Sequence, residues 1–338
     1  MKLARIVKTL SMFVLMLLIV FLILEQGSRF YLFGFDSLSY SKMNSVHALG
    51  VSGLLKPSSH LEIIYELKPN LDTYFKLVRF KTNSQGLRDK EYAKRKPQNT
   101  FRVVVLGDSF AMAAGVNIND AFHTILENRL NKESSDSSYE FINYGVGGYD
   151  PNQYLATLKY RGLEYDPDLV LFCLSSPLES FYAEKHYREI YKVKPKTYPF
   201  FESFFVKLTE INKIYIYLEG KHRKRKNEGN NDSERLKKLK NIFLRLREIS
   251  KTRSIPICIV ILQSNLRFQK KCEEIMVLAS QFGLYTINTI PAFQGRKKSE
   301  FYIYKIDKHP NAKANKIFAD VIYTYLKDRH IIGRVTKQ

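Results

Sequence analysis

Repeated strand-then-helix units fill the chain from Phe101 onward and constrain its fold more than any other feature. Apolar runs typical of buried strands lie at residues 103–106, 140–144, 169–174, 256–262 and 284–289, and helical periods lie at 118–130, 152–162, 233–251, 267–282 and 311–327. Parallel strands need long crossover connections, which are usually helices. The alternation therefore predicts a three-layer α/β/α sandwich with a central five-stranded parallel sheet.

The N-terminus carries an apolar segment that predicts one membrane-spanning helix. Residues 9–24 hold no charge, while Lys2, Arg5 and Lys8 precede them and Glu25 follows. A helix needs about 20 apolar residues to cross a bilayer, with some tolerance where flanking lysines reach the interface. Because positive flanks stay cytoplasmic, we expect a single-pass protein with a cytoplasmic N-terminus and the remaining chain in the cell envelope.

Two alternatives accompany this anchor. A cleaved signal peptide is disfavoured because residues 25–29 lack a small-x-small cleavage pattern. The aromatic residues that follow, Phe30, Tyr31, Phe33 and Phe35, suit either the outer membrane interface or an apolar linker that packs on the domain.

The chain is expected to have three parts. These are a membrane anchor at 1–28, a juxtamembrane and small β-rich lead-in at 29–98, and an α/β domain at 99–330 that holds an insertion at 178–232. The insertion is rich in aromatic residues and follows a central strand, so it is either a lid beside the site or a segment that packs on the sheet edge.

The net charge and the cysteine spacing limit the classes of binding partner and cofactor that are expected for this chain. Lys and Arg outnumber Asp and Glu by 54 to 33, which favours contact with anionic lipid or acidic polysaccharide. The densest basic run, 221–226, has no interleaved aromatic residues, so it is interpreted as a solvated loop and nucleic acid is not an expected partner. The three cysteines show no C-x-x-C spacing, and neither a metal nor any other cofactor is expected.

The first strand of the α/β domain ends in the turn Gly107-Asp108-Ser109, which small residues follow. A serine at the carboxyl tip of a central strand exposes its hydroxyl in the crevice of the sheet. Backbone N–H groups of the turn, and of the helix expected after it, then point at negative charge that develops beside the hydroxyl. Ser109 is therefore the candidate nucleophile.

A serine nucleophile needs a base, and the motif Asp307-Lys308-His309-Pro310-Asn311 supplies one. His309 is the candidate base and Asp307 the residue that orients it. We expect Pro310 to begin the last helix and His309 to lie in the loop just before it.

These blocks resemble the SGNH (GDSL-type) hydrolase family. The Gly-Asp-Ser turn, the glycine-bearing block at 143–149 and the late Asp/His-Pro-Asn block cover about residues 100 to 328. The resemblance implies a flavodoxin-like sheet, Ser109 as nucleophile and His309 as base. It also implies an oxyanion hole made by the N–H groups of Ser109 and Gly148.

Two departures from the family pattern are visible. The family has a Gly-x-Asn segment where this chain has Ser175-Ser176-Pro177, so the asparagine donor is absent and Ser175 or Ser176 is the candidate substitute. Loss of one oxyanion donor costs about a hundred- to a thousandfold in rate. The family also often has two residues between its Asp and His, whereas only Lys308 intervenes here.

The expected function is that of a serine esterase or deacylase that acts on O-acyl esters, O-acetyl first of all, of envelope glycans or lipids. Two alternatives stay open: an O-acyltransferase of the same fold, or a catalytically impaired envelope-binding protein. Arg88, in a lead-in segment similar to that of membrane-linked family members, is expected either to contact an acidic substrate or to pair with Asp89.

Overall fold

A computed structural model of the chain describes residues 2–47, 52–176, 228–304 and 307–332. Its centre is a five-stranded parallel sheet in the order β6-β5-β7-β8-β9. The strands are β5 (Thr100–Leu106), β6 (Ser138–Asn143), β7 (Leu169–Leu174), β8 (Ile257–Ile261) and β9 (Tyr285–Asn288). This confirms the predicted sheet and its flavodoxin-like order, in which the chain passes to opposite sides of β5.

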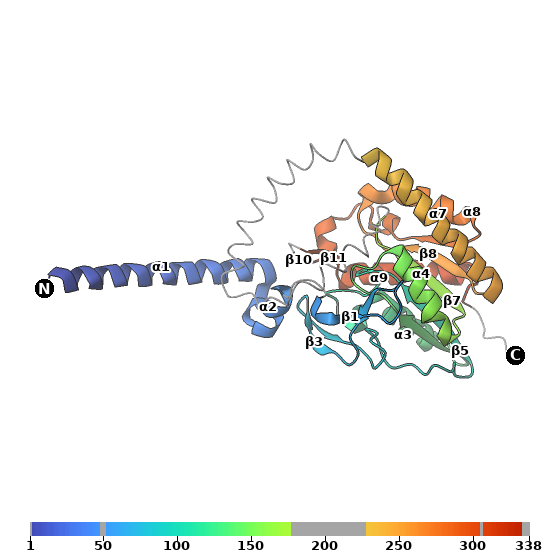
Figure 1. Ribbon diagram of the computed structural model, residues 1–338, viewed down its shortest axis with the longest axis horizontal. Helices are drawn as coiled ribbons and strands as arrows, with labels where there is room; N and C mark the ends of the chain where they lie inside the picture. The colour runs from blue at the N-terminus through green and yellow to red at the C-terminus, as the bar shows by residue number, and fades with distance from the viewer. Residues whose placement is uncertain (1, 48–51, 177–227, 305–306, 333–338) are drawn as a thin grey trace.

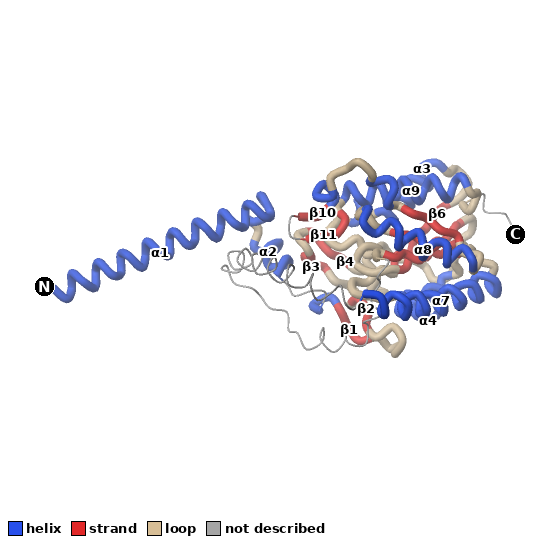
Figure 2. The backbone as a smooth tube through the Cα atoms, turned by 90° about the horizontal axis from the view of Figure 1, so that it is seen from above, coloured by secondary structure: helices blue, strands red, loops and turns tan. Residues whose placement is uncertain are grey.

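Helices cover both faces of the sheet, as Figures 1 and 2 show. The helices are α3 (Phe122–Glu133), α4 (Pro151–Tyr160), α7 (Glu228–Arg253), α8 (Gln269–Gln281) and α9 (Ala312–Asp328). One core lies between the sheet and α4, α7 and α8, and a second lies between the sheet and α3 and α9. Strands β7 and β8 are buried along their whole length, and their sequences are accordingly continuous apolar runs rather than alternating ones.

The N-terminal region consists of one long helix and two small hairpins. Helix α1 (Lys2–Phe33) projects from the domain (Figure 1), and η1 (Gly34–Leu38) and α2 (Tyr40–His47) follow it. The hairpins are β1 (Leu55–Pro57) with β2 (Tyr65–Leu67), and β3 (Asp72–Phe75) with β4 (Val78–Lys81). Within the described residues, one helix, Lys2–Tyr31, is long and apolar enough to cross a membrane. The lead-in expected at 29–98 thus holds its strands between residues 55 and 81, whereas its first part, up to His47, is mostly helical.

Two details of the predicted elements are wrong. Helix α3 begins at Phe122 rather than near Ile118, because the 3-10 turn η3 (Ile118–Asp120) precedes it. Pro310 does not begin the last helix: it ends strand β11 (Asp307–Pro310), and the Asn311 side chain caps α9 by accepting from Ala314 N–H. The insertion predicted at 178–232 and the basic run at 221–226 lie outside the described residues, except that α7 already includes residues 228–232.

Candidate active site

The turn that holds Ser109 follows β5 directly and is fixed on both sides. Gly107 has no room for a side chain, since a Cβ there would lie 2.5 Å from the Ala111 Cβ and 3.1 Å from the Cys173 carbonyl oxygen. Asp108 accepts the Phe110 N–H at 2.8 Å and the Ser175 hydroxyl at 2.7 Å. The carboxylate thus ties the turn to the end of β7, and the Ser109 side chain is left half-buried at the carboxyl edge of the sheet.

The structure brings the three predicted catalytic side chains together, although 200 positions separate the hydroxyl from its base. His309 Nε2 lies 2.9 Å from Ser109 Oγ, and His309 Nδ1 lies 2.5 Å from Asp307 Oδ1. The His309 backbone N–H also donates to Asp307 Oδ1 at 3.0 Å. His309 and Asp307 lie on β11, which pairs antiparallel with β10 (Tyr302–Tyr304), so a short hairpin rather than a loop holds the base.

A fourth side chain, Lys76, joins this group and was missed by the sequence analysis. Its ammonium donates to Asp307 Oδ2 and lies 3.1 Å from His309 Nδ1. Lys76 and Leu77 form the two-residue tip of the β3–β4 hairpin, since Phe75 pairs with Val78. The two-residue gap between the strand-like segments 72–75 and 78–81 is the signal that could have revealed a hairpin.

The hairpin tip has an unusual backbone. Lys76 and Leu77 both have positive φ, 49° and 70°, as in a type I′ turn. Gly and Asn normally occupy such positions, and a branched residue there costs about 1–3 kcal/mol. Conformations of this kind persist where the surrounding structure enforces them, and here the tip packs against the nucleophile loop near Gly115.

The ionisable groups of the site affect one another. Burial alone would raise the pKa of Asp307, but the hydrogen bonds and positive charges of His309 and Lys76 outweigh burial and hold this pKa well below its usual range. Burial raises the pKa of Asp108, against the opposing hydrogen bond from Ser175. Asp307 is therefore the carboxylate that stays ionised beside the imidazole.

The predicted oxyanion donors lie on two adjacent loops. The loop after β6 is joined to β5 because Tyr144 N–H donates to Val105 O and Val146 N–H donates to Gly107 O. Gly148 is exposed, with φ +82°. Among the described residues, none accepts a hydrogen bond from the N–H of Ser109 or of Gly148.

The candidate substitute donors differ in position. Ser175 is buried and its hydroxyl proton is already directed at Asp108, so it supports the nucleophile turn rather than offering a donor to substrate. This corrects the expectation that its hydroxyl replaces the missing asparagine. Ser176 follows it, half-buried, at the end of the described segment.

Arg88 has neither of the roles expected for it. Its side chain is buried, and it donates to the carbonyl oxygens of Met112 at 2.8 Å, Ala113 at 2.5 Å and Val116. Burial lowers the pKa of Arg88 to about 10. A planar guanidinium with several donors fits three converging carbonyls, so Arg88 holds the loop after Ser109 in place.

Neighbouring loops complete this support. Asn143, at the end of β6, donates to Ala111 O at 2.9 Å and accepts from Gly145 N–H at 2.8 Å. Gly145 packs so closely that a Cβ would lie 2.4 Å from Met112 N. In the part of the chain that the structure describes, no group of three or more His, Cys, Asp or Glu side chains is arranged to hold a metal ion.

A comparison with known proteins found several solved structures that are similar to this chain. No protein-family model matches the sequence, and no curated protein matches it. The chain is similar to TesA, with 16% identity, coverage of 67% of this chain and 98% of that one, and a TM-score of 0.40. It is similar to the psychrotrophic esterase EstA from Pseudoalteromonas sp., with 18% identity, coverage of 69% of this chain and 99% of that one, and a TM-score of 0.42. It is also similar to a variant of Axe2, an acetyl-xylooligosaccharide esterase from Geobacillus stearothermophilus, with 12% identity, coverage of 70% of this chain and 97% of that one, and a TM-score of 0.43.

Proposed function

We propose that this chain is a membrane-anchored serine esterase of the SGNH type, which removes O-acyl groups, O-acetyl first of all, from glycans or lipids of the cell envelope. The observation that carries the proposal is the hydrogen-bonded series Ser109 Oγ, His309 Nε2, His309 Nδ1 and Asp307 Oδ1, with distances of 2.9 Å and 2.5 Å across its two contacts. A nucleophile, a base and an orienting carboxylate in this sequence of contacts are the parts that acyl transfer requires.

The reaction proceeds in two halves. Ser109 Oγ attacks the ester carbonyl while His309 Nε2 takes its proton, and the N–H groups of Ser109 and Gly148 stabilise the negative oxygen. The proton then passes from His309 to the departing alcohol as the ester C–O bond breaks. Water, activated by the same imidazole, next hydrolyses the acyl-serine and releases a carboxylic acid.

Lys76 is a positioning residue in this proposal. Its ammonium occupies the Asp307 oxygen that His309 does not use, so the carboxylate has one orientation in which both oxygens are bonded. A fixed carboxylate keeps the imidazole in the tautomer whose Nε2 faces Ser109.

The proposed location is the outer side of a membrane, with the N-terminus of α1 in the cytoplasm. The support is the position of Lys2, Arg5 and Lys8 before the apolar part of α1. The net charge of +21 favours contact with anionic lipid or acidic polysaccharide. An alkaline phosphatase fusion after residue 338 is expected to be active in a bacterial host; activity of a cytoplasmic reporter at that position instead would reject this orientation.

The enzymatic test uses the full chain in detergent with an activated acetyl ester and a fluorophosphonate probe. We expect Ser109→Ala to lose probe labelling and at least about a thousandfold in kcat/KM, whereas the control Ser280→Ala, at an exposed helical serine, keeps both. Equal labelling and turnover in wild type and Ser109→Ala would favour the envelope-binding alternative. Faster acyl release in the presence of a sugar acceptor would favour the transferase.

A further inference from the structure

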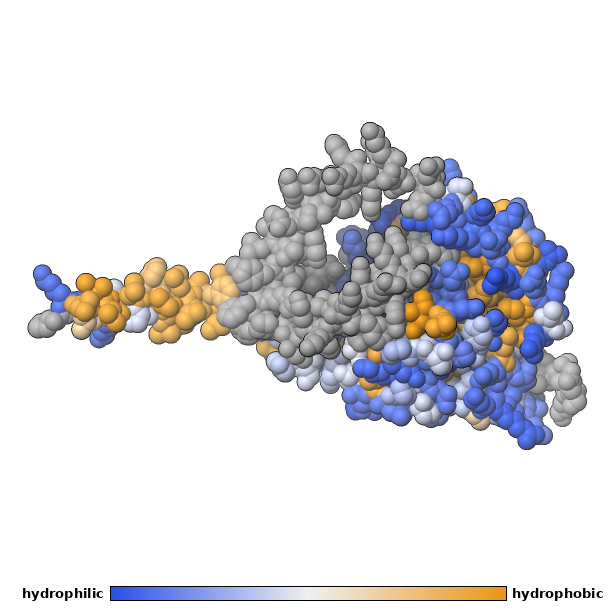
Figure 3. All heavy atoms as spheres, viewed as in Figure 1, coloured by the Kyte–Doolittle hydropathy of each residue, from blue (hydrophilic) through white to orange (hydrophobic). Residues whose placement is uncertain are grey.

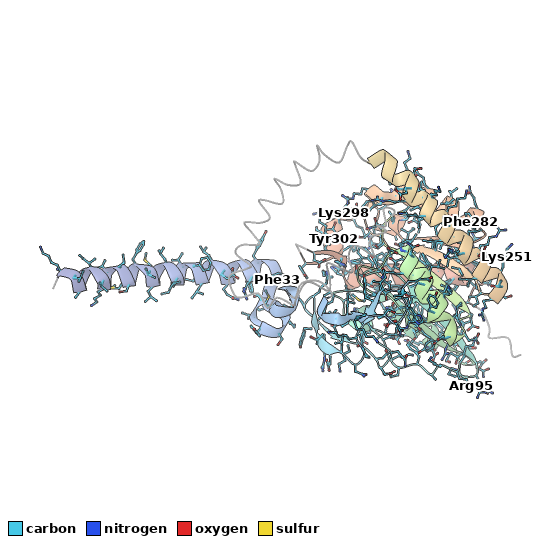
Figure 4. The ribbon with its side chains drawn as sticks, in the orientation of Figure 1. Phe33, Arg95, Lys251, Phe282, Lys298 and Tyr302 are labelled. Carbon is cyan, nitrogen blue, oxygen red and sulfur yellow. The ribbon has the colours of Figure 1, made fainter. Side chains whose placement is uncertain are left out.

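The end of the anchor helix lies close to the catalytic carboxylate. Phe33, the last residue of α1, contacts Tyr304 of β10 with 5.3 Å between ring centroids and an interplanar angle of 74°. Tyr304 in turn pairs with Asp307 across the β10–β11 hairpin. Figure 4 shows Phe33 at the point where α1 meets the domain, with Tyr302 of β10 on the facing side.

The β3–β4 hairpin makes a second connection between α1 and the site. Leu77 packs in one apolar cluster with Phe33, Met43 and Tyr304, while its neighbour Lys76 bonds Asp307. Figures 1 and 2 agree that β3, β10 and β11 lie on the side of the domain from which α1 projects. The site therefore lies at the membrane-facing end of the domain.

The length of α1 sets the height of the site above the bilayer. Its apolar part ends at Leu24, and the nine residues from there to Phe33 rise about 14 Å at about 1.5 Å per residue. The zone of lipid headgroups on each side of the hydrocarbon core is about 5–8 Å thick. For an upright helix, the Phe33 end beside the β10–β11 hairpin thus stands about 6–9 Å beyond this headgroup zone. That height suits a headgroup that extends from the bilayer, whereas the carbonyl groups that begin the fatty acyl chains lie well below it.

The residues around this junction suit such a position. Phe30, Tyr31 and Phe35 are exposed, and aromatic side chains of this kind gather at membrane interfaces. Figure 3 shows the apolar surface of α1 leading to a domain whose described surface is largely hydrophilic. Phe33 packs on the domain, as the linker alternative expects, whereas the membrane interface stays a prediction for its three exposed neighbours.

We infer that the substrate is an O-acyl ester on the headgroup of a membrane-embedded lipid, which reaches Ser109 by lateral diffusion in the leaflet beneath the domain. This inference rests on the proposed esterase function and specifies where its substrate is held. The acyl group moves from a headgroup oxygen to Ser109 Oγ, the headgroup regains a hydroxyl proton from His309, and water then releases the acid. Fatty acyl esters at the glycerol level lie too deep for this route.

The test compares the same activated acetyl ester at different positions relative to the bilayer surface. The full chain is reconstituted in phosphatidylcholine vesicles with a fluorogenic acetyl ester that is coupled to a phospholipid headgroup, coupled to the end of a fatty acyl chain, or free in solution. At about 10 μM bulk ester, confinement to one membrane raises the effective concentration to about the millimolar range. We therefore expect the headgroup-coupled ester to turn over on the order of a hundredfold faster than the free ester, and the chain-coupled ester to be the slowest.

The outcomes separate the two proposals. Ser109-dependent turnover of the free ester, with no preference for the headgroup-coupled form, would overturn the substrate inference and leave the esterase function intact. Faster turnover of the chain-coupled ester than of the headgroup-coupled ester would also overturn it. If no ester shows turnover that depends on Ser109, the esterase function fails and this inference fails with it.

Discussion

Replacing Lys76 with methionine tests whether the hairpin tip controls the base of the site. Methionine keeps an unbranched, flexible side chain of similar length and removes the charge that lies 3.1 Å from His309 Nδ1. Without the ammonium, one oxygen of Asp307 loses its partner, and the carboxylate holds His309 less firmly in the orientation that faces Ser109. The value of kcat/KM is then expected to fall.

The size of the loss follows from the contact between Lys76 and Asp307 and from the exposure of these two side chains. Two unit charges about 4 Å apart interact by about 1 kcal/mol in water and about 4 kcal/mol at an effective dielectric constant near 20. The Lys76 and Asp307 side chains are 18% and 15% exposed, and solvent screening keeps the effect toward the lower end of this range. A loss of roughly 1.5 kcal/mol of transition-state stabilisation corresponds to about a tenfold lower kcat/KM.

The assay measures hydrolysis of an activated acetyl ester by the full chain in detergent. Lys76→Arg keeps the charge and should retain most of the wild-type kcat/KM. Lys81→Met is the matched control, because Lys81 lies on the same hairpin but is 59% exposed and pairs with Asp72. If Lys76→Met keeps the wild-type kcat/KM, or if Lys76→Arg loses as much as Lys76→Met, the charge of Lys76 does not position Asp307 and the reasoning is wrong.

Three further variants test the support around the nucleophile. Arg88→Met leaves three backbone carbonyls without their donor and should lower the free energy of unfolding by about 3 kcal/mol in urea titrations; the exposed control Arg95→Met should change it by less than about 0.5 kcal/mol. Burial raises the pKa of Asp89 to about 7, so the folded chain binds the carboxyl proton more tightly than the unfolded chain does. The free energy of unfolding gained in this way is fully present below about pH 4 and is lost as the pH rises to about 7. Asp89→Asn removes this titration, so wild type should lose about 4 kcal/mol relative to the variant between pH 4 and 8, and parallel stability curves would count against it. Ser175→Ala removes the donor to Asp108 and should lower kcat about tenfold, whereas a fall of a hundredfold or more in kcat would instead identify Ser175 as an oxyanion donor.

The sequence was sufficient to predict the sheet because its strands are buried on both faces. Runs such as that of β7 are continuously apolar, and their predicted and observed bounds coincide at Leu169–Leu174. Ser109 and His309 were found for a related reason, since each lies in a short motif whose local sequence differs from its surroundings. Strands and motif residues of this kind can be predicted because the residues that determine them are neighbours in the sequence.

The residues that were missed depend on distant contacts. Lys76 meets Asp307 across 231 positions, and its turn lacks the Asn or Gly that normally marks a positive-φ hairpin. Arg88 is a charged residue in a polar segment, which predicts exposure, but three carbonyls of the nucleophile loop satisfy it inside the protein. The start of the last helix was misplaced because a proline often begins a helix, whereas the Asn311 cap determines this one.

The separation of Ser109 from His309 along the chain has a consequence for how the protein is made. At about 5–20 residues per second, synthesis of the 200 positions between them takes about 10–40 s. During that interval Ser109 has been synthesised without His309, so the hydrogen bond between them cannot yet form. A chain truncated before β11 lacks both His309 and Asp307 and cannot assemble the side chains on which the proposed esterase function depends.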